Sequence, residues 1–257
     1  MIIINIQDYV ECRKGTIPLI FSVPHGGTTN FDTIPDRTGG IHGVDKDTVK
    51  LAFELVENIT SLFQRTFKDI RTPSYVISKI KRVKIDFNRK ESEAFFFKSN
   101  VAREIYQYYH SKIQELISYN LNKFKRSLLI DIHGFEKSKR PNGFRDVELV
   151  LGTNNLESMF PNKLPKKEWG KNFRGKIVRT FNELNIQIAP GHHARKEYVL
   201  TGGYIIQKYG ASRIKNSQAI QIEFSDTIRL HDDQLREKTL KSLAQLFFEE
   251  NVITNYK

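Results

Sequence analysis

The stretch Leu128-Leu129-Ile130-Asp131-Ile132-His133-Gly134-Phe135 decides how the rest of this sequence is interpreted. Its apolar residues predict a buried strand that delivers polar side chains to the rim of a sheet. Asp131 and His133 are two positions apart, so on a strand their side chains point to the same face. An acid beside a histidine can fix the tautomer of the ring and raise its basicity, as a metal ligand requires. The alternative is a histidine that is satisfied by hydrogen bonds at the start of a loop.

Predicted strands and helices alternate along the remaining sequence. A continuous apolar run at residues 17–23 predicts a central strand that leads into Pro24-His25-Gly26-Gly27. Further strands are expected at residues 76–87, 146–152, 186–189 and 219–224, and helices at residues 46–67, 98–124, 167–184 and 234–250. The alternation is typical of an α/β protein, here with a mixed, mostly parallel central sheet and helices on both faces. Since no linker-like segment divides the chain, residues 1–257 are expected to form a single domain.

The composition is typical of a soluble globular protein. The chain has 257 residues, of which 39% are hydrophobic, and no apolar run approaches the roughly 20 residues that a membrane helix requires. The stretch Met1-Ile2-Ile3-Ile4-Asn5 lacks the charged region and cleavage site of a secretory signal. A single cysteine, Cys12, excludes an internal disulfide and a metal site built from cysteines. We therefore expect a cytoplasmic protein that does not associate with membranes.

The charge of the chain is strongly positive. Its 41 basic and 29 acidic residues give a formal charge of +12. Such a charge fits nucleic-acid binding, attraction of an anionic substrate, or merely a solvated surface. Because no nucleic-acid-binding module accompanies the basic residues, we do not expect a nucleic-acid partner, and a non-enzymatic nucleic-acid binder is kept only as an alternative.

Polar residues gather where the predicted strands end. In open α/β sheets the functional site lies beyond the carboxyl ends of the strands. A buried acid or histidine costs several kcal/mol unless it is paired, so repeated occurrences at strand ends are informative. The set contains two histidines and several carboxylates but no thiolate, which suits zinc, with manganese, cobalt or iron as alternatives. Its members are His25, the run Asp86-Phe87-Asn88-Arg89, Asp131 with His133, and Glu223 with Asp226.

Five short motifs follow one another in the order seen in N-formylglutamate amidohydrolases. They are Pro24-His25-Gly26-Gly27, Asp86-Phe87-Asn88-Arg89, Asp131-Ile132-His133-Gly134, Gly202-Gly203-Tyr204 with Tyr209-Gly210, and Gln221-Ile222-Glu223. Over about residues 19–230 the sequence resembles this family, which is similar in turn to zinc carboxypeptidases. The resemblance implies the phosphorylase/hydrolase-like fold of the zinc carboxypeptidases and the use of one zinc ion.

The resemblance implies that His25 and His133 are two metal ligands. Zinc carboxypeptidases place a glutamate three residues after the first histidine, where this sequence has Thr28. The amidohydrolases instead supply an acid before the first helix, and Asp45 fits that position. Asp47 is the competing candidate, and its alternative role is that of an acid at the helix start that favours the helix dipole.

The resemblance also assigns roles beside the metal. Asp86 is expected to orient the first histidine. Asn88 and Arg89 look like the clamp for a substrate carboxylate, since a planar guanidinium can bond both oxygens. Arg82 is expected to add a second positive group or to polarise the scissile carbonyl; a charged strand edge is the alternative.

The last motifs concern catalysis and the substrate. Glu223 is the expected general base, because a carboxylate there can take a proton from water and hand it to the leaving amine. Gly202 and Gly203 would let the chain approach a ligand closely, and Tyr204 or Tyr209 would contact the substrate.

The sequence therefore predicts a metal-dependent amidohydrolase. Its expected partner is a small-molecule carboxylate, such as an N-acyl (for example N-formyl) acidic amino acid. A carboxypeptidase-like peptidase or another N-acyl amino acid deacylase is the alternative, because metal sites are shared and pocket residues decide the substrate. Gly26 and Gly134 stand where many relatives carry serine after the histidine, so the resemblance does not decide which substrate is cleaved.

Overall fold

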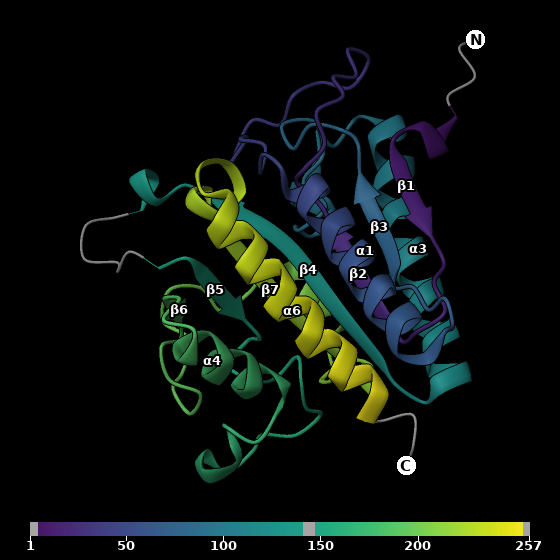
Figure 1. Ribbon diagram of the computed structural model, residues 1–257. Coiled ribbons are helices and arrows are strands. Elements are labelled where there is room, and N and C mark those ends of the chain that lie inside the picture. Colours follow the sequence, from purple (N-terminus) through teal and green to yellow (C-terminus); the bar gives the residue numbers. More distant parts are fainter. Residues whose placement is uncertain (1–4, 141–146, 254–257) are drawn as a thin grey trace.

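The computed structural model describes residues 5–140 and 147–253, and within them seven strands form one sheet in the order β1-β3-β2-β4-β7-β5-β6 (Figure 1). The strands are β1 (Val10–Arg13), β2 (Leu19–Val23), β3 (Ser74–Ser78), β4 (Ser127–Phe135), β5 (Leu149–Gly152), β6 (Ile188–Ala189) and β7 (Ser217–Ser225). β1 pairs antiparallel with β3, and β5 pairs antiparallel with β7. The pairs β2–β3, β2–β4, β4–β7 and β5–β6 are parallel. The predicted mixed, mostly parallel sheet is confirmed.

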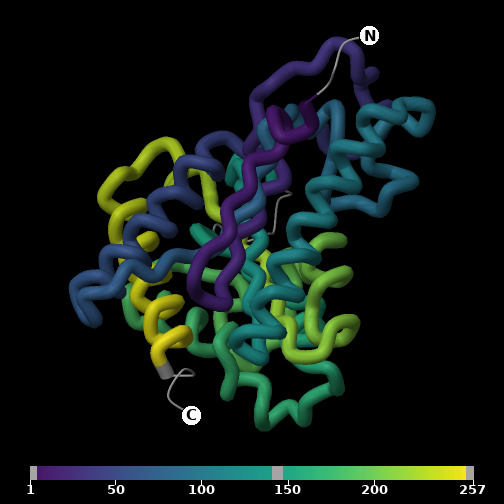
Figure 2. The backbone as a smooth tube through the Cα atoms, turned by 90° about the vertical axis from the view of Figure 1, so that its right-hand side faces the viewer, coloured from purple at the N-terminus to yellow at the C-terminus, as the bar shows by residue number. Residues whose placement is uncertain are grey.

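Helices cover both faces of this sheet (Figure 2). The described α-helices are α1 (Thr48–Phe67), α2 (Glu91–Ala94), α3 (Asn100–Phe124), α4 (Phe173–Glu183), α5 (Tyr204–Tyr209) and α6 (Asp233–Ile253). One apolar core joins the sheet to α1, α4 and α6, and a second joins the opposite face to α3 and α5. Within residues 5–140 and 147–253, no helix is both long enough and apolar enough to cross a membrane.

Strand β4 lies at the centre of the sheet, and its side chains divide between the two cores. Ile130 and Ile132 belong to the core beneath α1 and α6, whereas Leu129 belongs to the core beneath α3. Since side chains alternate along a strand, Asp131 and His133 project on the side of α3. The stretch that decides the interpretation of the sequence is therefore a buried central strand, as predicted, and it carries two polar side chains on one face.

The segment after β3 differs from the prediction. The alternation at residues 76–87 predicts one or two strands, but β3 ends at Ser78 and the chain continues in turns and isolated bridges. In a half-exposed strand the polar residues would face solvent, yet Arg82 and Lys84 are buried. Lys84 Nζ donates to the carbonyl oxygen of Ile34 at 2.7 Å. The buried polar side chains of residues 79–87 therefore have partners inside the protein, and the segment does not continue β3 as a strand.

Other helices and strands also differ from their predicted bounds. The helix predicted at residues 167–184 begins later, as α4, because the side chain of Asn172 accepts a hydrogen bond from the N–H of Gly175 and so caps the helix there. The strand predicted at residues 146–152 is β5, although Asp146 lies outside the described residues. The prediction missed β1, at the edge of the sheet, and the short helix α5.

The central position of β4 makes its apolar side chains sensitive to truncation. We expect Ile130→Ala to lower the free energy of unfolding by about 2–5 kcal/mol, because the removed methyl groups leave a cavity in a core that collapses only partly. Ile70→Ala is the matched control, since Ile70 is 65% exposed and surface substitutions usually change stability by less than about 0.5 kcal/mol. Urea denaturation followed by circular dichroism measures both, and equal losses would contradict the placement of β4.

Candidate active site

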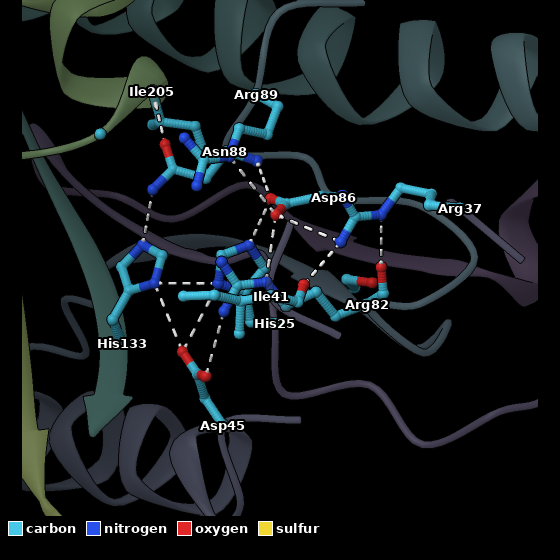
Figure 3. A network of polar contacts seen from close by, with 12 residues as sticks. His25, Arg37, Ile41, Asp45, Arg82, Asp86, Asn88, Arg89, His133 and Ile205 are labelled. Carbon is cyan, nitrogen blue, oxygen red and sulfur yellow. Dashed lines mark hydrogen bonds and ion pairs between the residues drawn. The ribbon is translucent and has the colours of Figure 1, made fainter. Parts of the chain in front are cut away.

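Three buried ionisable side chains meet at the carboxyl end of the central strands (Figure 3). His25 follows β2, His133 lies in the neighbouring strand β4, and Asp45 precedes α1. The N–H of Asp45 donates to the carbonyl oxygen of His25 at 3.0 Å, which ties the two loop residues together. The Nδ1 atoms of His25 and His133 are 3.1 Å apart, and they lie 3.5 and 3.4 Å from Oδ2 of Asp45.

The spacing of these three atoms is close to one face of a tetrahedral zinc site, with the two nitrogens slightly nearer to each other than in a bound site. With zinc bonds of about 2.0–2.2 Å to nitrogen and oxygen, neighbouring ligand atoms of a tetrahedron lie about 3.3–3.6 Å apart. Such a group of donors could hold a metal ion, and all three ligand atoms lie within 4.8 Å of one another. Three protein ligands are the number typical of catalytic zinc, whereas structural zinc usually has four.

The outer nitrogens of both rings face carboxylates. Nε2 of His25 lies 2.6 Å from Oδ1 of Asp86, and Nε2 of His133 lies 2.8 Å from Oδ2 of Asp131. Because an ionised carboxylate only accepts hydrogen bonds, each Nε2 carries the proton. In the neutral rings both Nδ1 atoms therefore present lone pairs toward Asp45, which is the state that binds a metal.

The electrostatics at this point favour positive charge. Burial opposes protonation of His133, but Asp131 and Asp45 outweigh it and raise the pKa of His133 to about 10. Burial likewise opposes ionisation of Asp45, yet His133 and His25 hold the pKa of Asp45 well below its ordinary value. A field that stabilises a proton here also stabilises a divalent cation.

Asp45, rather than Asp47, is the acid that reaches the histidines. Its Oδ2 accepts a hydrogen bond from the N–H of Gly134 at 3.1 Å, which fixes the carboxylate. Asp47 immediately precedes α1, but its side chain makes no capping hydrogen bond, and Oδ2 lies 3.7 Å from Nη1 of Arg236. The backbone turns at Asp47, where φ is 61°, so the two acids face different partners.

Asp86 is surrounded by positive groups (Figure 3). Its Oδ2 lies 3.1 Å from Nε of Arg82 and 3.6 Å from Nη2 of Arg37. Nε of Arg89 lies 3.8 Å from the same oxygen. Burial opposes ionisation, but His25, Arg82 and Arg37 hold the pKa of Asp86 well below its ordinary value. Asp86 is therefore a carboxylate that can accept the hydrogen bond from His25.

Arg82 and Arg89 differ in how much of each guanidinium is engaged. The side chain of Arg82 is 10% exposed, and it connects Asp86 to Asp45 through an Nη1–Oδ1 distance of 3.6 Å. Arg89 is 46% exposed and contacts Asp86 through Nε. Arg82 therefore lies among the acids of the site, and Arg89 is open to solvent. Contact between Arg82 and a substrate stays a prediction.

The amide of Asn88 lies between His133 and the start of α5. Oδ1 accepts a hydrogen bond from the N–H of Ile205 at 2.8 Å, and Nδ2 lies 3.2 Å from Nε2 of His133. Gly203 approaches so closely that a Cβ at this position would lie 2.2 Å from Nδ2 of Asn88. The glycine therefore makes room for a side chain of the site, in addition to any role toward a ligand.

Glu223 stands beside His133 on the neighbouring strand. β4 and β7 pair in parallel with His133 opposite Glu223. Oε1 of Glu223 accepts a hydrogen bond from Nε2 of Gln221 at 3.0 Å, and Oε2 lies 3.5 Å from Nη2 of Arg140. Burial raises the pKa of Glu223 above its ordinary value. A carboxylate with a raised pKa is suited to proton transfer near neutral pH.

These side chains share one cavity of about 450 Å³. Its volume is typical of sites that bind small molecules. Asp86 and Asp131 are fully buried behind the two histidines. The expected site residues that line the cavity are His25, Asp45, Arg82, Asn88, Arg89, His133 and Glu223.

The position of Tyr204 differs from the expectation. Tyr204 is not among the described residues that line the cavity. Its ring centre lies 5.8 Å from that of His110, in α3, and 5.5 Å from Nζ of Lys208. Helix α5 begins directly after Gly203, so its first turn carries Tyr204 toward α3 while the glycines stay at the cavity. Tyr209, the other candidate, is buried against His110.

Comparison with known proteins supports the fold. No family model matches the chain, and no curated protein sequence matches it. Among solved structures, N-formylglutamate amidohydrolase from Ralstonia eutropha JMP134 is 15% identical, with a TM-score of 0.64 and coverage of 96% of this chain and 97% of that chain. A gene product of Agrobacterium tumefaciens is 12% identical, with a TM-score of 0.57 and coverage of 96% and 95%.

This chain shares their fold. The fold implied by the sequence resemblance is therefore confirmed over nearly the whole length of both structures.

Several residues of the site were not expected from the sequence. Arg37 lies in a loop, and nothing around it marks it as a partner of Asp86. Arg140 ends the basic run Lys137-Ser138-Lys139-Arg140, and nothing in that run distinguishes a residue of the site from a solvated surface charge. Gln221 carried a usable signal, because it lies two positions before Glu223 on a strand and so shares its face.

The assignment of Asp45 can be tested against Asp47. We expect Asp45→Asn to weaken zinc binding by more than the about 10–100-fold that loss of a ligand's hydrogen-bond partner costs. Asp47→Asn should change the affinity by less than about threefold, because its side chain points to Arg236. Competition titration with a zinc chelator measures both affinities. Loss of zinc from the Asp47 variant alone would refute the assignment.

Proposed function

We propose that this chain is a zinc-dependent amidohydrolase. It cleaves the amide bond of an N-acyl acidic amino acid, such as an N-formyl derivative, or of a similar carboxylate-bearing small molecule. The observation that carries the proposal is the convergence of His25, Asp45 and His133 next to Glu223, inside one cavity. A metal-ligand group beside a separate carboxylate supplies both elements of metal-assisted hydrolysis.

Different residues of the chain have different roles in the proposed hydrolysis. When bound, a zinc ion lowers the pKa of water toward about 7 and polarises a carbonyl oxygen. Glu223 takes a proton from the attacking water and donates it to the nitrogen of the leaving amine. Asp86 and Asp131 hold the histidine rings in the tautomer that leaves each Nδ1 free.

Positive side chains support a substrate that bears a carboxylate. Arg89 lines the cavity with a partly exposed guanidinium, which can bond both oxygens of a carboxylate and so position the amide. The formal charge of +12 favours the approach of anions to the protein. The solved structure with a TM-score of 0.64 is named for N-formylglutamate, an acidic N-acyl amino acid, and this name motivates the first substrate to test.

Glu223 is the residue on which the proposed chemistry depends most directly. We expect Glu223→Gln to lower kcat by about 10²–10⁴-fold, because the amide cannot accept the proton from water. Zinc content, measured on the same preparation, should stay unchanged because Glu223 is not among the proposed ligands. Glu237→Gln, on the exposed face of α6, is the control and should keep full activity. Near-normal turnover by the Glu223 variant would refute this role.

The substrate class can be decided with a panel of related amides. The panel contains N-formyl and N-acetyl derivatives of glutamate, peptides with a free carboxyl terminus, and the same amides without any carboxylate. We expect the N-acyl acidic amino acids to give the highest kcat/KM. The amides without a carboxylate should give the lowest, because they offer no carboxylate for Arg89 to bind. Faster cleavage of the peptides would favour a carboxypeptidase-like activity instead.

A further inference from the structure

Arg140 is a positively charged side chain of the cavity, and the proposed reaction assigns it no role. It lies directly after the short helical turn at Lys137–Lys139 and lines the same cavity as Glu223. Its guanidinium carbon lies over the ring of Phe135, 4.0 Å from the ring centre, a cation–π contact that helps to hold the group in place. The ring of Phe135, in β4, thus presents Arg140 to the cavity.

The hydrogen-bonding capacity of Arg140 is only partly used. Its Nε is buried and has no hydrogen-bond partner among the described residues. Its Nη2 lies 3.5 Å from Oε2 of Glu223, longer than the about 2.7–2.9 Å of a tight charge-assisted bond. Arg229, another arginine of the cavity, differs because it donates to the carbonyl oxygens of Phe224, Phe135 and Lys46. A buried donor without an acceptor is costly, so an anion that supplies one would bind favourably.

Arg140 and Arg89 lie on opposite sides of the metal-ligand group. Arg89 contacts Asp86, which also faces His25, the residue that follows β2. Arg140 contacts Glu223, in β7. Because β4, with His133, lies between β2 and β7 in the sheet, the two arginines flank the histidine pair. A substrate held by both would carry two anionic groups.

We propose that Arg140 recognises a second carboxylate of the substrate and in doing so releases Glu223. This inference rests on the proposed function and adds a specificity-determining residue to it. In the free protein Oε1 of Glu223 is occupied by Gln221 and Oε2 faces Arg140. When a substrate carboxylate takes over the guanidinium, Oε2 becomes free to accept a proton from water. The cavity therefore selects dicarboxylates both by binding them and by activating its base.

A binding experiment tests the recognition without any turnover. The probes are glutarate and its monoamide, which differ in one charge and contain no N-acyl group. By calorimetry on the purified protein we expect about 10–100-fold tighter binding of glutarate. Arg140→Met should reduce this preference to less than about threefold, and Arg140→Lys should give an intermediate value because it keeps the charge but loses the planar fork.

Two controls make the result specific to Arg140. Arg103→Met removes an arginine on the exposed side of α3 and should leave the preference unchanged. Arg89→Met should weaken both probes by a similar factor, since both retain one carboxylate. An unchanged preference in Arg140→Met, or no preference in the wild-type protein, would overturn the inference.

Turnover separates the release of Glu223 from a merely structural role. On N-formylglutamate, Arg140→Met should lower kcat/KM by about 10–100-fold. On N-formylglutamine, kcat should stay the same or rise, because Glu223 is no longer held. Equal losses on both substrates would refute the release. If the wild-type protein cleaves neither substrate yet keeps the Arg140-dependent preference for glutarate, the proposed function fails while the second anion site stands.

Discussion

The site is built on the neutralisation of buried charge at one edge of the sheet. His25 and His133 each lie between an outer carboxylate, Asp86 or Asp131, and the shared inner carboxylate of Asp45. An isolated buried carboxylate would cost several kcal/mol, so each acid is retained only because hydrogen-bond donors or positive groups are fixed beside it. The three inner atoms all carry lone pairs when the rings are neutral, and their arrangement becomes favourable when a cation joins them.

The sheet supplies the spacing that this arrangement needs. Parallel neighbours in a sheet lie about 4.8 Å apart, and their carboxyl ends open at the same edge. β2, β4 and β7 are adjacent, so His25, His133 and Glu223 meet although more than a hundred residues separate the first two. The apolar alternation of β4 and β7 anchors both strands in the two cores, which keeps the polar side chains on one face. Packing therefore determines the geometry on which the proposed chemistry depends.

Parts of the site were predictable because the relevant periodicity is local. Asp131 and His133 are two residues apart on a strand, and that spacing alone predicts that they share a face. The pair Gln221 and Glu223 follows the same rule. The segment that contains Asp86 could not be predicted in this way, because its alternation is that of a strand while its polar residues are buried by partners from distant loops, among them Arg37.

The sequence by itself determined the alternation of strands and helices, the central strand and the candidate histidines and acids for a metal site. Those features depend on the spacing of apolar residues along the chain and on residue type, and both can be read directly from the sequence. Only the tertiary structure decided that Asp45 rather than Asp47 faces the histidines, that Tyr204 turns toward α3, and that Arg140 lies beside Glu223. These outcomes depend on a backbone turn, a helix start and a loop packed on Phe135, whose directions are set by contacts between residues far apart in the chain.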